Sequence, residues 1–313
     1  MVRPTISAII PSYNGKDLLA ACLPQLWGEL EQYGHQLIIV DDGSRDGTDR
    51  WLAQEYPRAR LVRGPHRGFA TAVNRGIREA RGNYTLLLNN DMLLYPGTLG
   101  RLVARLQGDR TLFAAGGCYL TPTGQGNKQR CSFCGGVHAD NYRHEQATRT
   151  GLDAPAGGGL FRTDLLQWLG GFDELYRPFY WEDIDLGWNA WRAGYRIIFD
   201  GRARMRHEHG ATIHRYHRPI EYQAANWRNL YLFAWKNLGA GMLARHLAGL
   251  PVRAVRARYA GYARSWLYGL AAALPALPRA LCARARRPAA ALDDRGILGS
   301  AMVNQEQLLK QVF

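Results

Sequence analysis

The first hundred residues alternate between short apolar runs and stretches of helical periodicity. Within residues 69–80, for example, apolar side chains recur every three or four positions, which is the spacing of one face of a helix. Four runs have the length and composition of buried strands, at residues 6–10, 36–40, 60–62 and 85–88. Alternation of this kind predicts an α/β fold, in which a Rossmann-like, mostly parallel sheet is flanked by helices.

After residue 110 the pattern becomes less regular. Residues 121–158 are rich in Gly, Thr, Asn and charged side chains, which is typical of loops or short hairpins. Further strands are predicted at 112–120 and 196–199, and helices near 162–164 and over 181–193. From Asn226 onward, Ala, Leu, Arg and aromatic residues predict helices that are separated by Pro251, Pro275, Pro278 and Pro288.

Three of the predicted strands end in polar residues, namely P-S-Y-N (11–14), D-D-G-S (41–44) and N-N-D (89–91). Because ligands bind beyond the carboxyl ends of parallel strands, these three ends predict one site at that edge of the sheet. Asp41 and Asp42 could accept hydrogen bonds from a base or a ribose hydroxyl. Alternatively, one of them, together with Ser44, shapes the turn or caps the next helix.

The N-N-D cluster suits a hard divalent cation. Mg²⁺ and Mn²⁺ prefer oxygen ligands, and they commonly take one or two carboxylates together with water and substrate phosphates. Asp91 would be the direct ligand, and Asn89 would reach a ribose or a metal-bound water. The alternative is an Asx-turn that simply ends the strand.

Two further clusters offer chemistry. E-D-I-D (182–185) places three carboxylates at a predicted helix start, where the helix dipole favours them. If that helix points at the cleft, one of these carboxylates can act as a general base. H-E-H-G-A-T-I-H (207–214) follows a predicted strand and offers histidines at the rim of the site, for a metal or a phosphate.

The positive charge of the chain is concentrated near its C-terminus. The formal net charge is +14 over 313 residues, yet no Asp or Glu occurs between Tyr222 and Leu292. That stretch carries eleven basic residues: Arg228, Lys236, Arg245, Arg253, Arg256, Arg258, Arg264, Arg279, Arg284, Arg286 and Arg287. Such asymmetry predicts an anionic partner, either a membrane surface or a nucleic acid.

An apolar stripe in this basic region favours the membrane. Its residues recur at steps of three and four, the layout of an interfacial helix: Val252, Val255, Tyr259, Tyr262, Trp266 and Leu270. The alternative is a helix that packs on the α/β domain through the same stripe, and the two interpretations can hold for different helices. The longest uncharged run, 265–278, has 14 residues and two prolines, whereas a spanning helix needs roughly 20 apolar residues.

The N-terminus lacks the layout of a signal peptide, and the five cysteines are scattered, so we expect a reduced, cytoplasmic protein. Cys131 and Cys134 are either half of a zinc site or, as the lack of a second C-x-x-C favours, two free thiols. Neither a G-x-x-x-x-G-K-[ST] phosphate loop nor a G-x-G-x-x-G after the first strand is present.

Taken together, the ordered motifs resemble the family-2 glycosyltransferases. They are P-S-Y-N, V-D-D-G-S-R-D-G-T (40–48), G-F-A-T-A-V-N-R-G-I (68–77), L-L-L-N-N-D and W-E-D-I-D-L-G (181–187), and the similarity covers about residues 5–215. The resemblance implies a GT-A fold in residues 1–225, with a nucleotide-sugar half over about 1–110 and an acceptor half over about 111–225. Residues 226–313 would form a basic, amphipathic helical extension.

The resemblance also implies residue roles. Asp183 matches the catalytic base, and Asp91 matches the last carboxylate of the family's D-x-D metal motif, in which Asn89 replaces the first Asp. That replacement weakens metal binding from the first position. His207 would complete the shell of Mg²⁺ or Mn²⁺, with His209 as the alternative. The nucleotide sugar would contact Pro11, Tyr13, Asp41, Asp42, Arg67, Asn89 and Asn90. The acceptor side would hold Trp181, Glu182 and Asp185.

The implied activity is inverting transfer of a hexosyl or deoxyhexosyl group from a nucleotide-diphosphate sugar to a hydroxyl. The acceptor would be a saccharide or lipid-linked precursor of a cell-surface polysaccharide, reached from the cytoplasmic face of the inner membrane. Two rival hypotheses are a basic nucleic-acid-binding protein and a catalytically inactive nucleotide-sugar-binding regulator. Salt-sensitive oligonucleotide binding would favour the first rival, although we expect no nucleic acid, and sugar transfer would exclude the second.

Overall fold

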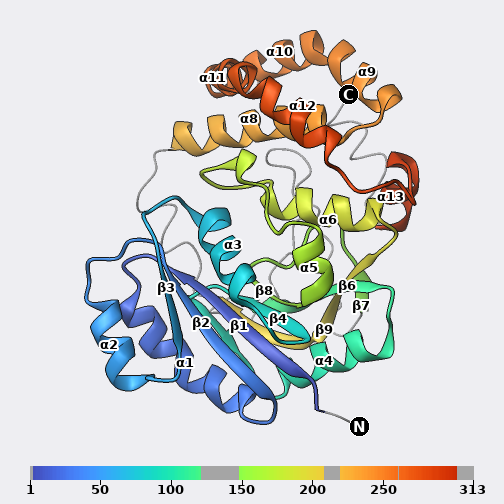
Figure 1. Cartoon of the computed structure of the whole chain (residues 1–313). Coiled ribbons are helices and arrows are strands. Elements are labelled where there is room, and N and C mark those ends of the chain that lie inside the picture. Colours follow the sequence, from blue (N-terminus) through green and yellow to red (C-terminus); the bar gives the residue numbers. More distant parts are fainter. Residues whose placement is uncertain (1–2, 121–147, 208–218, 260, 302–313) are drawn as a thin grey trace.

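A computed structural model describes residues 3–120, 148–207, 219–259 and 261–301 (Figure 1). Cys131, Cys134 and His209 lie outside the described residues. The described strands are β1 (Thr5–Ser12), β2 (Gly34–Asp41), β3 (Arg60–Arg63), β4 (Tyr84–Leu88), β5 (Met92–Leu94), β6 (Leu112–Leu120), β7 (Thr148–Thr150), β8 (Gly158–Arg162) and β9 (Arg196–His207). All nine belong to one sheet with the order β3-β2-β1-β4-β8-β6-β9-β5, and β7 pairs with β9.

The sheet is parallel in its first half and mixed in its second half. Strands β3, β2, β1 and β4 are parallel neighbours, as the strand–helix alternation predicts. Strand β8 then runs antiparallel between β4 and β6, while β6 pairs with β9 in parallel. Strands β5 and β7 are both antiparallel to β9. The predicted fold class is confirmed, with a larger antiparallel share than the sequence pattern indicates.

Helices cover both faces of the sheet (Figure 1). Those of the first 207 residues are α1 (Lys16–Leu30), α2 (Thr48–Glu55), α3 (Phe69–Glu79), α4 (Thr98–Gly108), α5 (Thr163–Trp168), the 3₁₀ turn η1 (Glu174–Tyr176) and α6 (Glu182–Arg192). Because side chains alternate along a strand, Leu86 and Leu88 of β4 pack in one apolar core with α1 and α4. Leu87 faces the other core, together with α3 and α6.

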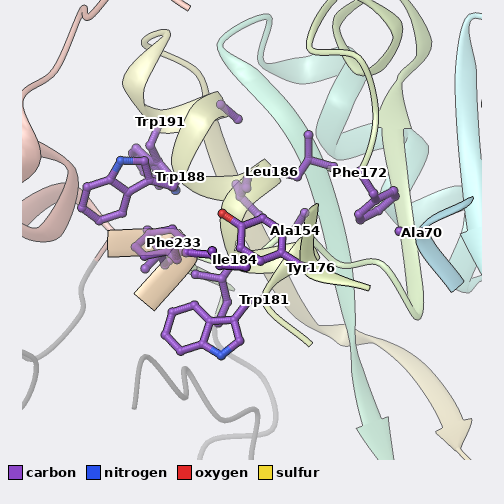
Figure 2. Close-up of a cluster of buried hydrophobic side chains, with 14 of the residues drawn as sticks. Ala70, Ala154, Phe172, Tyr176, Trp181, Ile184, Leu186, Trp188, Trp191 and Phe233 are labelled. Atoms are coloured by element: carbon purple, nitrogen blue, oxygen red, sulfur yellow. The ribbon is translucent and has the colours of Figure 1, made fainter. Parts of the chain in front are cut away.

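The C-terminal helices complete that second core. They are α8 (Pro219–Asn237), α9 (Ala240–Ala248), α10 (Leu250–Tyr259), α11 (Ala263–Ala273), the 3₁₀ turn η2 (Leu274–Ala276), α12 (Leu277–Ala285) and α13 (Asp294–Ser300). Figure 2 shows Phe233 of α8 among Trp181, Trp188 and Ile184 of the segment that contains α6. The Phe233 ring lies 5.3 Å from that of Trp181 and 5.4 Å from that of Trp188. The predicted boundary between residues 225 and 226 therefore falls inside α8, whose side chains share a core with α6.

The apolar stripe of residues 252–270 is divided between two helices. Val252, Val255 and Tyr259 of α10 are 48%, 55% and 86% exposed. In contrast, Trp266 of α11 is buried, and Tyr262 stacks on Trp227 of α8 at 5.6 Å. Gly261, whose φ of 76° is in the left-handed region, separates the two helices. The prediction of one continuous stripe was wrong: the α10 part faces solvent, and the α11 part packs on α8.

Helix α11 packs unusually closely against α8. A Cβ on Gly269 would come within 2.8 Å of the Ala224 carbonyl oxygen, so only glycine allows the two backbones this approach. Segments α11, η2 and α12 continue from Ala263 to Ala285, 23 residues with mean hydropathy 1.2 in their most apolar window. Length and composition alone would let this stretch span a membrane, although 28% of that window is buried inside the protein. The 14-residue uncharged run is thus part of a longer helical segment.

Candidate functional site

Asp42 organises the loop that follows β3. This buried carboxylate accepts hydrogen bonds from the backbone N–H groups of Arg67, at 3.1 Å to both oxygens, and Gly68, at 2.9 Å. The guanidinium of Arg75 lies 3.3 Å from it, and Nδ1 of His66 lies 2.9 Å from it. Asp42 therefore joins the end of β2 to loop 64–68, and the Arg67 side chain is exposed in front of that edge.

Tyr13 and His66 form an aromatic pair at the same edge. Their ring centroids lie 3.9 Å apart with an interplanar angle of 21°, so the rings are stacked. His66 is 56% exposed, and Pro11 and Tyr13 are half-buried. A flat aromatic surface beside oriented polar groups suits a planar ring such as a nucleobase. Sequence reasoning missed His66, because its contact with Asp42 joins two separate loops.

Asp41 shapes the neighbouring turn. Its Oδ1 accepts a hydrogen bond of 2.8 Å from the backbone N–H of Ser44. The Ser44 hydroxyl in turn accepts one of 2.8 Å from the backbone N–H of Asn14. The structure therefore shows the turn-shaping role considered for one carboxylate of D-D-G-S, and Asp41 is the one that fills it. That Asp41 and Asp42 also hold a base stays a prediction.

The N-N-D cluster lies at the end of β4, where the strand meets two other segments. The Asn90 amide donates to the Ser12 hydroxyl at 3.1 Å, and the backbone N–H of Asn89 donates to the Gly157 carbonyl at 2.9 Å. Asp91 is half-buried between β4 and β5. In the antiparallel pair of β5 and β9, Met92 lies opposite His207. The register thus brings the backbone of His207 next to the residue that follows Asp91.

This donor set fits a hard divalent cation with few protein ligands. The protein would supply one carboxylate, a nearby amide and a histidine position on the adjoining strand. Most coordination positions of the metal would then be filled by water and phosphate oxygens, as is common for Mg²⁺ and Mn²⁺. Within the described part of the chain, His, Cys, Asp and Glu form no group of three or more that could hold a metal ion. The residues present therefore suit a cation shared with a phosphorylated ligand rather than a closed protein cage.

The start of α6 presents two adjacent carboxylates. The turn before it is tight, since Tyr180 and Trp181 have φ values of 69° and 78°. Glu182 is buried, and its Oε2 has no hydrogen-bond partner among the described residues. Asp183 is half-buried, and its Oδ1 accepts a bond of 2.8 Å from the backbone N–H of Ile184.

Tyr119 and Asp153, which sequence reasoning missed, lie within electrostatic reach of Asp183. Burial raises the pKa of Asp183, whereas the N–H of Ile184 opposes that shift. Burial, followed by the charge of Asp183, raises the pKa of Glu182 to about 8 and that of Asp153 to about 7. Burial, followed by the charges of Asp153 and Asp183, also raises the pKa of Tyr119. A carboxylate with a raised pKa is suited to accept a proton from a hydroxyl near neutral pH.

One short segment connects the two ends of the site. The backbone N–H of Ala154 donates to the Asp183 carbonyl at 3.0 Å, and three residues later the Gly157 carbonyl accepts from Asn89. Three residues of extended chain span roughly 10 Å at most. The helix start that carries Asp183 and the strand end that carries Asp91 therefore flank the same few residues.

Asp185 and Trp181 have structural partners. Asp185 is 3% exposed and lies 2.6 Å from the Lys236 ammonium, and it accepts hydrogen bonds from the Tyr176 hydroxyl and the Asn237 amide. The Trp181 indole is buried and donates to Asn226 of α8 at 2.6 Å. Both residues fasten the α6 segment to α8. Of the carboxylates in E-D-I-D, Asp185 is thus held by partners in the interior, and the acceptor-side role of Trp181, Glu182 and Asp185 stays a prediction.

Comparison with known proteins identifies relatives of this chain. The chain is 29% identical over 230 residues to an N-acetylglucosaminyl-diphospho-decaprenol L-rhamnosyltransferase of Mycobacterium tuberculosis, covering 63% of this chain and 73% of that enzyme. Among solved structures, a mannosyltransferase of Pyrobaculum calidifontis in complex with GDP-Man and Mn²⁺ matches with a TM-score of 0.54 and 20% identity. That match covers 100% of this chain and 86% of the other.

A second solved structure, S. aureus TarS 1-349 in complex with UDP-GlcNAc, matches with a TM-score of 0.57 and 19% identity over 89% of this chain and 83% of that one. These structures support a GT-A fold. The sequence profile described as Glycosyl transferase family 2 matches residues 7–166, about half of the chain, including β1 to β4, the N-N-D cluster and Asp153. The chain therefore belongs to glycosyl transferase family 2, and it is a glycosyltransferase.

Proposed function

We propose that this glycosyltransferase is metal-dependent and inverting, and that it moves a hexosyl or deoxyhexosyl group from a nucleotide-diphosphate sugar to a hydroxyl of a lipid-linked saccharide. The observation that carries the proposal is the position of Asp183. This half-buried carboxylate with a raised pKa stands at a helix start, one short segment away from the N-N-D cluster. The substrate class is supported by the rhamnosyltransferase relative, which is named for a diphospho-decaprenol acceptor.

The donor would bind along the carboxyl ends of β1, β2 and β4. Its base would lie against the stacked Tyr13 and His66 rings, and the loop that Asp42 holds would close over its ribose and phosphates. Asn89 and Asn90 would orient the sugar-proximal part. Asp91 and His207 would hold Mg²⁺ or Mn²⁺, which when bound would neutralise the diphosphate leaving group as a Lewis acid.

Asp183 would accept the proton of the acceptor hydroxyl as that oxygen attacks the anomeric carbon. The diphosphate leaves from the opposite face, so a single displacement inverts the configuration and no protein nucleophile is needed. Burial and the charge of Asp183 raise the pKa of Glu182, and Asp183 would be the proton acceptor of the two because its Oδ1 is held by the backbone N–H of Ile184, which favours the charged form.

We further propose that the enzyme is attached to the cytoplasmic face of the membrane through its C-terminal helices. The exposed apolar residues Val252, Val255 and Tyr259 alternate on α10 with the exposed arginines 256 and 258. Each basic residue near an anionic leaflet contributes about 1 kcal/mol, so a few suffice for reversible attachment. The α11 part of the stripe packs against α8, so the α10 part is the part of this stripe that would contact the membrane surface.

The test begins with a panel of nucleotide sugars. In the presence of Mn²⁺, the cognate donor should raise the melting temperature, because a ligand that binds only the folded state stabilises it. Transfer from that donor to a lipid-linked acceptor should then give a product whose anomeric configuration, measured by NMR, is opposite to that of the donor. Retention of configuration, or full activity in excess EDTA, would contradict the inverting or the metal-dependent part, respectively.

A further inference from the structure

A cavity lies apart from the donor edge, between the first 207 residues and the C-terminal helices. It has a volume of about 930 Å³, and its walls come from residues 168–177, one side of α6, α8 and α12 with the residues that follow it. Helix α6 lies beneath α8 and α12 in Figure 1. Neither the N-N-D cluster nor Asp183 contributes to its lining. We call this cavity the arginine pocket.

The lining of the arginine pocket carries an excess of positive charge. Its cationic side chains are Arg177, Arg228, Lys236, Arg279, Arg286 and Arg287, and its carboxylates are Asp173, Glu174 and Asp185. Lys236 is held between Asp173 and Asp185, at 2.7 and 2.6 Å. Arg177 lies 3.5 Å from Glu174 at the exposed rim. The carboxylates of the pocket are therefore already engaged.

The remaining cations differ in whether a protein group neutralises or uses their charge. Arg287 donates to the carbonyls of Arg284 and Asn237, so it caps the end of α8. Arg228, Arg279 and Arg286 form no ion pair with any carboxylate in the part of the chain that the structure describes. Arg228 is the most enclosed of the three and donates to the Arg177 carbonyl at 3.0 Å.

The guanidinium group of Arg228 is repelled by those of Arg279 and Arg177. Burial, and then the charges of Arg279 and Arg177, lower the pKa of Arg228. Arg228 is half-buried and Arg279 and Arg286 are exposed, so these like charges line one cavity without an ion pair to any described carboxylate, and a bound anion would relieve their repulsion. Arginine is suited to phosphate, because its planar fork donates two parallel hydrogen bonds to phosphate oxygens.

Exposed apolar side chains on the helical stretch that carries the pocket arginines indicate what the anion is attached to, although they do not line the pocket itself. Leu274 and Leu281 are 55% and 50% exposed, and they belong to the same helical stretch as Arg279 and Arg286. On the adjoining α11, Leu267 and Tyr268 are 55% and 59% exposed. A hydrocarbon chain that leaves the pocket would therefore find an apolar surface to cover.

We propose that the arginine pocket binds the phosphate or diphosphate group of a lipid, with the hydrocarbon chain lying along the exposed side of η2, α11 and α12. Where the phosphate belongs to the acceptor lipid, the inference rests on the proposed function and specifies how that acceptor is held. The same chemistry is also present in a membrane phospholipid. In either case the pocket adjoins the chain that leads to the catalytic carboxylates, since Arg177 precedes Glu182 by only five residues.

The first experiment measures the phosphate chemistry alone. Binding of inorganic pyrophosphate is followed by calorimetry in EDTA, which removes the divalent cation that the donor edge would use. The variant is Arg279→Gln with Arg286→Gln, and the matched control is Arg101→Gln with Arg110→Gln, which also removes two charges from exposed positions but lies outside both the pocket and α10. We expect the pocket variant to bind at least about ten-fold more weakly and the control to bind like the wild type.

A second readout reports from inside the pocket. Cys282 lines it and its thiol is free and exposed, so bound pyrophosphate should slow alkylation of Cys282, measured by peptide mass spectrometry. Protection should disappear in the pocket variant and persist in the control. No pyrophosphate binding by the wild type, or equal binding by the pocket variant, would overturn the proposal.

Two further arms distinguish the sources of the phosphate. If the acceptor supplies it, the pocket variant raises KM for the diphosphate-linked acceptor but not for a soluble acceptor without phosphate. If a phospholipid supplies it, the pocket variant loses binding to phosphatidylglycerol vesicles more than the control does, and KM is unchanged. No difference in either arm would overturn the lipid part. Because the pyrophosphate and vesicle measurements do not need turnover, failure of the proposed transferase activity would be recognised separately.

Discussion

Replacement of Lys236 by Met tests how the C-terminal helices hold the catalytic segment. Lys236 on α8 lies 2.7 Å from Asp173 and 2.6 Å from Asp185, and its side chain is only 7% exposed. The Asp185 side chain is 4% exposed, so it cannot regain water when the ammonium is lost. Removal of one partner of a buried ion pair costs about 3–5 kcal/mol. Because Asp173 is 28% exposed and can be hydrated, we expect about 3 kcal/mol, the lower end of that range.

The assay is urea denaturation followed by tryptophan fluorescence, in which the free energy of unfolding is extrapolated to zero urea. The double variant Lys236→Met with Asp185→Asn should be less destabilised than Lys236→Met alone, because no uncompensated charge remains. Arg258→Met, an exposed control on α10, should change the free energy by less than about 0.5 kcal/mol.

The pH dependence gives an independent check. Burial lowers the pKa of Lys236, but the charges of Asp185 and Asp173 together outweigh it and raise the pKa, so the folded state retains the proton more strongly than the unfolded chain. This contribution to stability is fully present below the ordinary amine pKa of 10.5 and is lost as the pH rises through the higher folded pKa. A loss of less than about 1 kcal/mol at pH 7, or strictly additive effects in the double variant, would refute the reasoning.

Four further outcomes are expected. Asp91→Asn should abolish transfer while circular dichroism shows an intact fold, and wild-type turnover in this variant would remove Asp91 from the metal site. Asp183→Asn should reduce kcat by about 10²- to 10⁴-fold with little change in donor affinity, and a greater loss in Glu182→Gln would mean that Glu182 is the base. Glu182 has a folded pKa of about 8 against a usual 4.5, so its contribution to stability is present below pH 4.5 and lost as the pH rises through 8. Melting temperatures of Glu182→Gln should therefore fall less than those of the wild type between pH 5 and 9, and parallel curves would contradict the raised pKa. Val255→Ser with Tyr259→Ser should weaken binding to anionic vesicles without lowering thermal stability, because both side chains are exposed, and unchanged sedimentation with vesicles would exclude α10 as the interfacial element.

The parallel half of the sheet could be predicted from sequence because its strands are continuous apolar runs. Strand β8 could not be, although it is central in the sheet. It begins with Gly158 and Gly159, which contribute no hydrophobic signal, and G-G-G (157–159) follows Ala156 rather than a recognisable strand. The glycines are needed for packing: a Cβ on Gly158 would lie 2.6 Å from the Met205 sulfur. Because close packing requires glycine at these positions, β8 lacks the run of apolar side chains by which a strand is predicted from sequence.

The candidate site was predictable where the chemistry is contiguous in sequence and not where it depends on distant pairs. N-N-D and E-D-I-D were apparent as clusters, and the structure brings them to two ends of one segment. In contrast, Asp153 is a single carboxylate in a loop, and its importance comes from Asp183, thirty residues away. Asp185 could not be separated from Asp183 by sequence, because its partner Lys236 is distant in the chain.

The position of β8 also has a consequence for how the chain is made. Strand β4 is fully buried and pairs on one side with β1 and on the other with β8, which begins 70 residues after β4 ends. A ribosome adds roughly 5–20 residues per second, so the second edge of β4 stays without its partner for roughly 4–14 s of synthesis. An apolar strand with an open edge is a template for aggregation. The nascent N-terminal half should therefore be a chaperone substrate until residue 162 has left the exit tunnel, and a fragment that ends near residue 110 should aggregate when expressed alone.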